Sequence, residues 1–202
     1  MKPTSNWERT QAQMGLSNEQ LAPGGHTVRI MGAEVRNSKA GREMLVLFLD
    51  VKEGSQYDGI FQRKWQNNKG YGRTNWPNDG TMYTLTADKD GNTNPRFKGL
   101  IQAVSESNSG FEWRWDENSL KGKMIGVVFG EEEFVGQNDG QIHVAVKPKY
   151  VCPVNKIDEQ PVPKIRKVQE DAVPESEPVS DNFTEVQDDD LPFEFGGRKG
   201  VM

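Results

Sequence analysis

Alternating apolar and polar positions predict a β-rich region in the middle of the chain. His26 to Asn37 alternates as a strand with one buried face, and Gly32 shifts the alternation, which predicts a bulge or a sharp bend. Glu43 to Val51 is apolar on both faces, as a central strand would be. Residues 38–41 lie between these two segments, and they predict a hairpin connection.

The next segments predict two more strands. Ile60 to Gln66 alternates again and predicts a third strand, in which Phe61, Arg63 and Trp65 share one face. Residues 67–80 are polar and glycine-rich, so we expect a loop there. Residues 82–87 predict a short additional strand.

A helix and a final hairpin follow. Asn94 is suited to an N-cap and Pro95 to the first helical turn. Apolar residues then recur at helical spacing: Phe97, Leu100, Ile101 and Val104. Residues 123–135 and 141–151 predict two strands, and the Asn-Asp-Gly sequence between them favours a tight turn.

This order of elements predicts a mainly β, OB-fold-like five-stranded barrel with one helix between strands 3 and 4. That fold is a partly open Greek-key barrel that commonly binds oligonucleotides or oligosaccharides. The order of strands in space cannot be derived from the sequence, so other small β-barrels stay open. Fold alone does not decide function.

Composition divides the 202 residues into three parts. Hydrophobic content is 34% and mean hydropathy is -0.79, which suits one folded domain with a polar tail. We predict an N-terminal extension over 1–22, the OB-fold-like domain over 23–157, and a disordered, proline-containing acidic tail over 158–202. Sparse apolar residues in the tail cannot offset an ordering entropy of roughly 1–2 kcal/mol per residue.

The formal charge of -5 is unevenly distributed along the chain. Residues 168–197 hold 10 acidic residues and no Lys or Arg. Subtracting them from the total of 30 leaves 20 acidic residues against 25 basic ones, a net charge of +5 for the rest. A basic body predicts an anionic partner, and an acidic tail predicts an interaction segment.

The sequence also predicts a compartment. There is no run of about 20 apolar residues and no apolar signal-peptide core at the N-terminus. A single cysteine, Cys152, excludes an intramolecular disulfide and suits a reducing environment. We therefore expect the cytoplasm.

Single-stranded nucleic acid requires positive charge for its phosphates and aromatic faces for its unstacked bases. Both residue types interleave in the first hairpin, the third strand, the loop after it and the last strand. The candidate nucleic-acid-binding residues are Arg36, Lys39, Arg42, Arg63, Lys64, Trp65, Lys69, Tyr71, Arg73, Trp76, Lys147 and Lys149.

Packing in the core is the competing interpretation of each aromatic residue. We favour it for Phe61 and Phe129, which neighbour other apolar residues. Trp113 and Trp115 share a face and are expected to pack across the end of the barrel. Trp65 stays open between the two roles.

The sequence does not predict an enzyme, a cofactor or a metal site. His26 and His143 are far apart, and neither has metal-ligand spacing. Cys152 precedes a proline at the end of the last strand and predicts an inert, half-buried thiol. The three consecutive glutamates 131–133 predict a solvated strand edge, because adjacent side chains on a strand point in different directions.

The stretch D-D-D-L-P-F, residues 188–193, resembles the acidic tip of bacterial single-stranded DNA-binding proteins. In that family the tip follows a disordered linker and docks on replication and repair proteins. The resemblance implies that Asp188, Asp189 and Asp190 meet basic rims and that Pro192 and Phe193 fill an apolar pocket, with Leu191 part of the same partner-binding motif.

One feature departs from that family. The bacterial tip ends at its Phe, whose terminal carboxylate is part of the recognition, whereas nine residues follow Phe193 here. A pocket that clamps a carboxylate could not engage Phe193 in the same way. The tail therefore has a second interpretation, in which its acids compete with DNA for the basic groove.

The body, over about residues 20–157, resembles a bacteriophage family encoded near recombination and replication genes. The matching stretches include V-R-N-S-K-A-G-R-E-M-L-V-L-F-L-D-V and G-K-M-I-G-V-V-F-G-E-E-E-F. Members of that family are regarded as single-stranded DNA-binding proteins. The resemblance implies sequence-independent DNA binding in phage replication or recombination, in the host cytoplasm.

Two rival functions stay open at this point. The first is a structural or virion β-barrel, against which a basic groove with exposed aromatic residues argues. The second is a carbohydrate-binding barrel, for which a carboxylate constellation would be expected. The sequence does not determine the oligomeric state, the site size or the preference between DNA and RNA.

Overall fold

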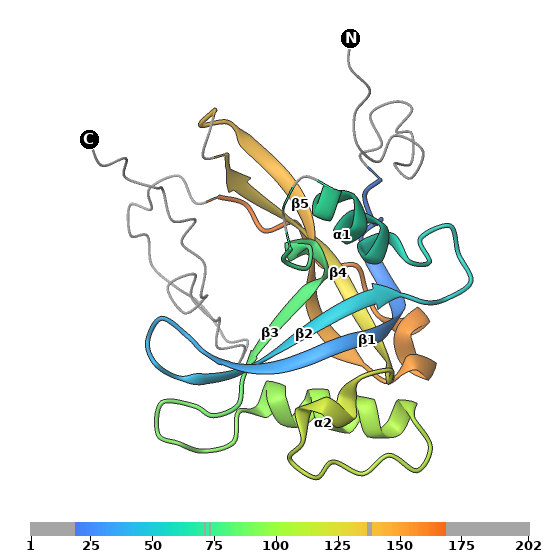
Figure 1. Ribbon diagram of the computed structural model, residues 1–202, viewed down its shortest axis with the longest axis vertical. Helices are drawn as coiled ribbons and strands as arrows, with labels where there is room; N and C mark the ends of the chain where they lie inside the picture. Colours follow the sequence, from blue (N-terminus) through green and yellow to red (C-terminus); the bar gives the residue numbers. More distant parts are fainter. Residues whose placement is uncertain (1–18, 71, 73, 137–138, 169–202) are drawn as a thin grey trace.

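The structure, a computed structural model, describes residues 19–70, 72, 74–136 and 139–168 (Figure 1). Five strands form one antiparallel sheet in the order β3-β2-β1-β4-β5. The strands are β1 (Gly24–Asn37), β2 (Glu43–Val51), β3 (Thr81–Leu85), β4 (Met124–Val135) and β5 (Ile142–Cys152). The helices are α1 (Ile60–Gly70), α2 (Pro95–Ser107) and the short 3-10 helices η1 (Asn78–Gly80), η2 (Glu117–Leu120) and η3 (Val154–Glu159).

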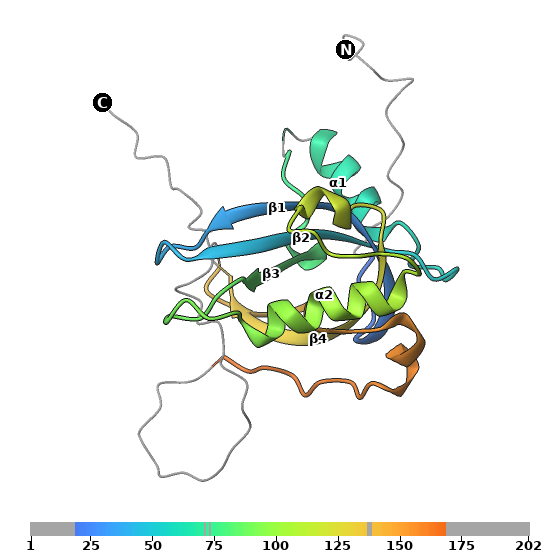
Figure 2. The ribbon, with the colours of Figure 1, turned by 90° about the horizontal axis from the view of Figure 1, so that it is seen from below.

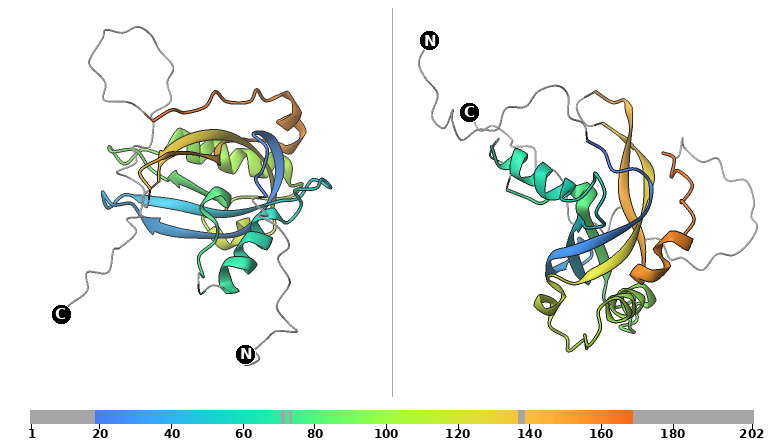
Figure 3. Two further views of the ribbon diagram at one scale, coloured as in Figure 1. Left: turned by 90° about the horizontal axis from the view of Figure 1, so that it is seen from above. Right: turned by 90° about the vertical axis from the view of Figure 1, so that its right-hand side faces the viewer.

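The predicted mainly β fold is confirmed, but a closed barrel is not. Within the described ranges β3 and β5 are the two edges of the sheet and do not pair with each other. All five residues of β3 pair with β2. A strand this short offers few backbone groups for a second ladder, so the curled sheet stays open (Figure 3).

The curl of the sheet begins at the predicted bulge in β1. The register between β1 and β2 shifts between Ile30 and Gly32. Before the shift, Gly24–Arg29 pairs with β4, while β2 pairs with β1 on both sides of the bulge. A bulge bends a strand and increases its twist, so β1 can serve both halves of the sheet.

The concave face of the sheet and one side of α2 form the main core. The fully buried side chains include Ile30, Leu49, Val127 and Phe129, and α2 adds Phe97, Leu100 and Val104. As predicted, Asn94 is the N-cap of α2, and its side chain accepts a hydrogen bond from the Arg96 N–H at 2.8 Å. Figure 2 shows α2 lying across the sheet.

The predicted third strand, residues 60–66, is wrong: this segment is the start of α1. The helix follows a turn at Gly59, whose φ is 75°. The carboxylate of Asp50, at the end of β2, accepts the Phe61 N–H at 3.0 Å and thereby begins the helix. Phe61 is buried in the core, as predicted, whereas Arg63 and Trp65 do not share a strand face.

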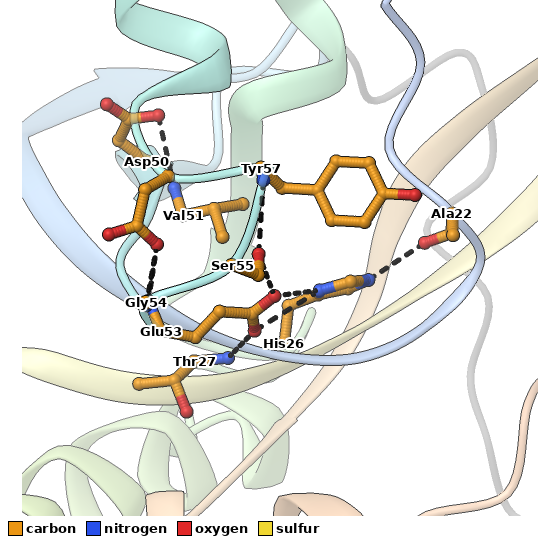
Figure 4. Close-up of polar contacts among 10 residues, drawn as sticks. Ala22, His26, Thr27, Asp50, Val51, Glu53, Gly54, Ser55 and Tyr57 are labelled. Carbon is orange, nitrogen blue, oxygen red and sulfur yellow. Dashed lines mark hydrogen bonds and ion pairs between the residues drawn. The ribbon is translucent and has the colours of Figure 1, made fainter.

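The loop between β2 and α1 is held by carboxylates (Figure 4). Asp58 accepts hydrogen bonds from the Glu53 and Gly54 N–H groups at 2.8 and 2.9 Å. Glu53 in turn accepts the Thr27 N–H at 3.1 Å and lies 3.1 Å from Nδ1 of His26. The loop is therefore tied to the start of β1.

His26 is buried and links three segments. Its Nε2 atom lies 2.9 Å from the carbonyl oxygen of Ala22, and its ring packs edge-on against Tyr57 (Figure 4). The ring also packs edge-on against Phe129. Both ring nitrogens thus face hydrogen-bond acceptors. This arrangement gives His26 a structural role at the start of β1.

Residues 160–168, which we call the strap, lie along the part of β4 that β1 leaves unpaired. The Arg166 N–H donates to the Glu131 carbonyl at 3.1 Å, and the Glu133 N–H donates to the Arg166 carbonyl at 2.8 Å. The part of the chain that the structure describes therefore includes residues 158–168, which we assigned to the tail. The strap is held by backbone hydrogen bonds rather than by apolar side chains. Its low apolar content therefore did not indicate that it pairs with β4.

Candidate nucleic-acid interface

The predicted binding residues fall in three places of the fold. The β1–β2 hairpin carries Arg36, Lys39 and Arg42; α1 and the segment after it carry Arg63, Lys64, Trp65, Lys69 and Trp76; β5 carries Lys147 and Lys149. Tyr71 and Arg73 lie outside the described residues, as does the motif Asp188 to Phe193. The interface must therefore be assembled from separate elements.

Three aromatic rings form a row that joins α1 to the sheet. The Trp65 and Trp76 ring centroids are 5.7 Å apart, and those of Trp76 and Phe48 are 6.3 Å apart. Phe48 lies on the convex face of β2, opposite the main core. We call Phe48, Trp76 and Trp65 the aromatic row.

Both indole N–H groups of the aromatic row are fixed by backbone carbonyls. Trp65 Nε1 donates to Thr74 at 2.9 Å, and Trp76 Nε1 donates to Leu49 at 3.1 Å. Trp76 also packs against the main core, and both indoles are partly buried. The ring orientations are therefore set by the fold, which lowers the entropy cost of stacking a base on them.

Gly32 makes room for the sheet end of the aromatic row. A Cβ atom at this position would lie 3.2 Å from Cδ2 of Phe48. The glycine that creates the bulge in β1 thus also lets the Phe48 ring lie over that strand. The sequence indicated the bulge, but not this packing role.

The convex face around Phe48 is apolar and was missed by the sequence reasoning. Met44, Val46 and Leu85 are buried there as a second cluster, with Phe48 and Tyr83 packed against it. Burial raises the pKa of the Tyr83 hydroxyl, while Arg36 lowers it and Glu34 raises it. In the sequence, the sign of this second cluster was that β2 is apolar on both faces. A central strand buried on both faces explained the same pattern equally well.

Lys69 places a positive charge on the aromatic row. Its Nζ atom lies 4.2 Å from the centroid of the Trp65 ring, a cation–π contact. The side chain is exposed. A base that stacks on Trp65 would displace this exposed ammonium group from the ring face, and the phosphate beside the base would then meet it.

Arg63 and Lys64 make ion pairs that hold α1 in place. Arg63 pairs with Glu19 at 2.7 Å and donates to the Asp58 carbonyl, while Lys64 pairs with Asp79. Their charges are thus partly neutralised by acidic neighbours. Of the α1 cations, Lys69 is the better candidate for a phosphate contact.

The β1–β2 hairpin presents a second group of cations. Lys39 is exposed at the turn, while Arg36 pairs with Glu34 on β1. The Arg42 N–H donates to the buried Ser38 hydroxyl at 3.0 Å and closes the turn. The hairpin leads directly into the convex apolar face through Met44.

The β5 lysines surround Glu132, which corrects the prediction of a solvated glutamate edge. Lys149 contacts Glu132 at 2.6 Å and Lys147 contacts it at 3.6 Å. Burial raises the pKa of Glu132, but the Lys149 hydrogen bond and the charges of Lys147, Lys149 and Arg166 outweigh it, so the pKa is lowered. Lys164, Arg166 and Lys167 of the strap bring further positive charge to this side.

The described part of the chain offers little support for a metal site or a reactive thiol. No group of three or more His, Cys, Asp or Glu residues in that part could hold a metal ion. Cys152 is buried, and burial raises the pKa of its thiol, which favours the unreactive protonated form. No helix in the described ranges is long and apolar enough to cross a bilayer.

The aromatic row, the Lys69 contact and the cationic hairpin together could hold unstacked bases and their phosphates. A scan against models of protein families finds no match for this chain, and a search of curated proteins finds no match either.

Proposed function

We propose that the protein binds single-stranded DNA without sequence preference, through the aromatic row and the cations beside it. The aromatic row is the observation that carries this proposal. Two indoles and one phenyl ring follow one another at 5.7 and 6.3 Å, and Lys69 lies 4.2 Å from the outermost ring. Stacking on aromatic rings tolerates any sequence, because every base has a π-face.

The charges around the aromatic row support binding of a DNA strand with an affinity that depends moderately on salt. Arg63 and Lys64 are matched by Glu19 and Asp79. Lys69, over the Trp65 ring, and Lys39, at the β1–β2 turn, remain as exposed cations. Because few phosphates would be neutralised, stacking would contribute a large share of the affinity, at about 1–3 kcal/mol per base.

The curled sheet favours one fold class. We infer an OB-fold-like architecture, since the sheet curls on itself and β3 lies near β5 across the open edge. α2 lies between β3 and β4 in the chain, as in that fold. The aromatic row beside this face, where Phe48, Trp76 and Trp65 are only partly buried, would then be the ligand site.

We also propose a role in phage DNA replication or recombination, in the cytoplasm of the host. The resemblance of residues 20–157 to a phage family supports this role. The acidic segment around D-D-D-L-P-F would recruit replication or recombination proteins or compete with DNA. Neither activity requires catalysis or a cofactor.

A fluorescence titration with oligo-dT across a salt series tests the proposal. Single strands are expected to quench tryptophan emission, because Trp65 and Trp76 would stack on bases, and duplex DNA is expected to quench it far less. The affinity is expected to fall as salt rises. Absence of both quenching and binding at low salt would refute DNA binding, and salt-independent binding of a glycan would favour the carbohydrate rival.

A further inference from the structure

A second aromatic platform lies at the other end of the molecule, between α2 and η2. Trp115 is 76% exposed, although large aromatic side chains are usually at least half buried. Its ring centroid is 6.2 Å from that of Trp113 and 6.2 Å from that of Phe97. The sequence prediction that Trp113 and Trp115 both pack across the end of a barrel therefore holds only for Trp113.

The backbone holds Trp115 in an unfavourable conformation. Its φ is 60°, and no other non-glycine residue in the described ranges has a positive φ. Bulky residues rarely adopt the left-handed region, because their side chains crowd the backbone there. The following residues are fixed by Asp116, which accepts the Asn118 N–H at 3.0 Å and caps η2.

The support beneath Trp115 is rigid. Phe97 is buried in the first turn of α2, and Trp113 packs against the main core and meets Phe97 edge-on at 6.2 Å. The Nε1 atom of Trp113 is buried and has no hydrogen-bond partner in the part of the chain that the structure describes. An exposed indole thus rests on two anchored rings, one of which has an unused donor.

Positive charge surrounds this platform. Residues 94–98 and 111–123 hold five cations, Arg96, Lys98, Arg114, Lys121 and Lys123, against three carboxylates, Glu112, Asp116 and Glu117. Arg114 is 81% exposed and pairs with Glu112 at 3.3 Å, whereas Lys98 and Lys121 are exposed and Lys123 lies 5.1 Å from the Phe111 ring centroid. A net positive surface around an exposed indole fits a polyanion that carries aromatic bases.

We propose that Trp115 is a second stacking site for the same DNA strand, on the platform of Phe97 and Trp113. This inference rests on the proposed function and extends it. α1 and the segment between α2 and η2 lie at opposite ends of the sheet (Figures 1 and 3). A short oligonucleotide reaches only one of the two sites, whereas a longer strand runs from the aromatic row around the sheet to Trp115.

The test compares Trp115→Gly with Trp115→Phe in the full chain. Glycine adopts a φ of 60° readily, so Trp115→Gly keeps the fold and is expected to unfold at the same temperature or a higher one. Trp115→Phe keeps a stacking ring. Binding is followed by the anisotropy of labelled oligo-dT, which does not depend on tryptophan emission.

Two lengths of oligo-dT distinguish the sites: about 8 nucleotides, within the span of one OB-type site, and roughly 40 nucleotides. Trp115→Gly is expected to weaken binding of the long strand about five-fold or more and to leave the short one within about two-fold. Trp115→Phe is expected to remain within about two-fold of the natural protein at both lengths.

Equal binding of the long strand by Trp115→Gly and the natural protein would overturn the second site and leave the proposed function intact. If binding is unchanged but Trp115→Gly alters the oligomeric state in sedimentation, Trp115 belongs to a protein contact, and the inference is wrong. If the natural protein binds neither length, the proposed function fails, and the second site fails with it.

Discussion

The Oδ1 atom of Asp50 lies 3.0 Å from the backbone nitrogen of Phe61 and accepts its hydrogen bond. It also accepts the Val51 N–H at 3.1 Å. One buried carboxylate thus ends β2 and begins α1. Because α1 carries Trp65 and Lys69, this contact also positions the proposed DNA-binding residues.

Replacement of Asp50 tests that dependence. Asp50→Ala is expected to lower the free energy of unfolding by roughly 1–2 kcal/mol, as loss of a helix cap does. Asp50→Asn retains an acceptor oxygen and is expected to cost less. Urea denaturation measures both, and equal stability of Asp50→Ala and the natural protein would show that α1 does not need this cap.

The Asp50 contact explains why residues 60–66, for which the sequence predicted a strand, form a helix. The alternation of Phe61, Arg63 and Trp65 is a genuine two-residue pattern, and the apolar stripe of this short helix is weak. The signal that begins the helix comes from Asp50, on the preceding strand. A pattern read within one segment does not include such a contact.

The other elements were predictable because their signals are local. β2 begins and ends as predicted, and the Asn94 cap and Gly32 bulge were each visible in a few neighbouring residues. The strap was not predictable, since its backbone bonds to β4 depend on where β1 stops pairing. For the same reason the sequence identified Trp65 and Trp76 but not their contact.

Acid stability is expected to depend on Asp58. The Glu53 backbone N–H and the Lys52 side chain lower its pKa to about 2. The unfolded chain takes up this proton near pH 4, before the folded protein does. The stability that ionised Asp58 contributes is therefore present above pH 4 and is lost as the pH falls toward 2.

Asp58→Asn checks this expectation. At pH 7 the variant is expected to unfold at a lower temperature than the natural protein, and the difference is expected to shrink as the pH falls from about 4 to about 2. Melting temperatures across this range measure it. A difference that stays constant with pH would contradict a contribution from the Asp58 charge.

The two tryptophans of the aromatic row are expected to behave differently. Trp65→Ala is expected to weaken oligo-dT binding by about 1–3 kcal/mol with little change in melting temperature. Trp76→Ala is expected to reduce both binding and stability, the latter by roughly 2 kcal/mol, because Trp76 packs against the core. Trp65→Phe is the control, and normal binding by Trp65→Ala would place the interface elsewhere.

Lys69 is expected to set part of the salt dependence. Lys69→Ala is expected to weaken binding of all sequences alike and to reduce the slope of log K against log salt by about 0.7. Lys69→Arg keeps the charge and is expected to keep the slope. An unchanged slope in Lys69→Ala would mean that the ammonium group contacts only the Trp65 ring.

The acidic tail gives the last prediction, and the strap determines where to cut it. The Val168 N–H donates to the Glu133 carboxylate at 3.2 Å, so the deletion should begin at residue 169. Removal of 169–202 is expected to leave the melting temperature nearly unchanged and to tighten oligo-dT binding at low salt. The reason is that the 10 carboxylates of residues 168–197, which then no longer compete with phosphates, all lie in the deleted part.

The difference between the two proteins is expected to close as salt rises, since competition between exposed charges is screened. A full-length variant with Asp188, Asp189 and Asp190 replaced by Asn is expected to show part of the same gain.

Phe193→Ala keeps every charge, so DNA binding is expected to stay the same while capture of replication or recombination proteins is lost. If the truncated protein binds DNA no more tightly at any salt concentration, the tail does not compete for the groove. If Phe193→Ala still captures every partner, D-D-D-L-P-F is not the recruiting motif.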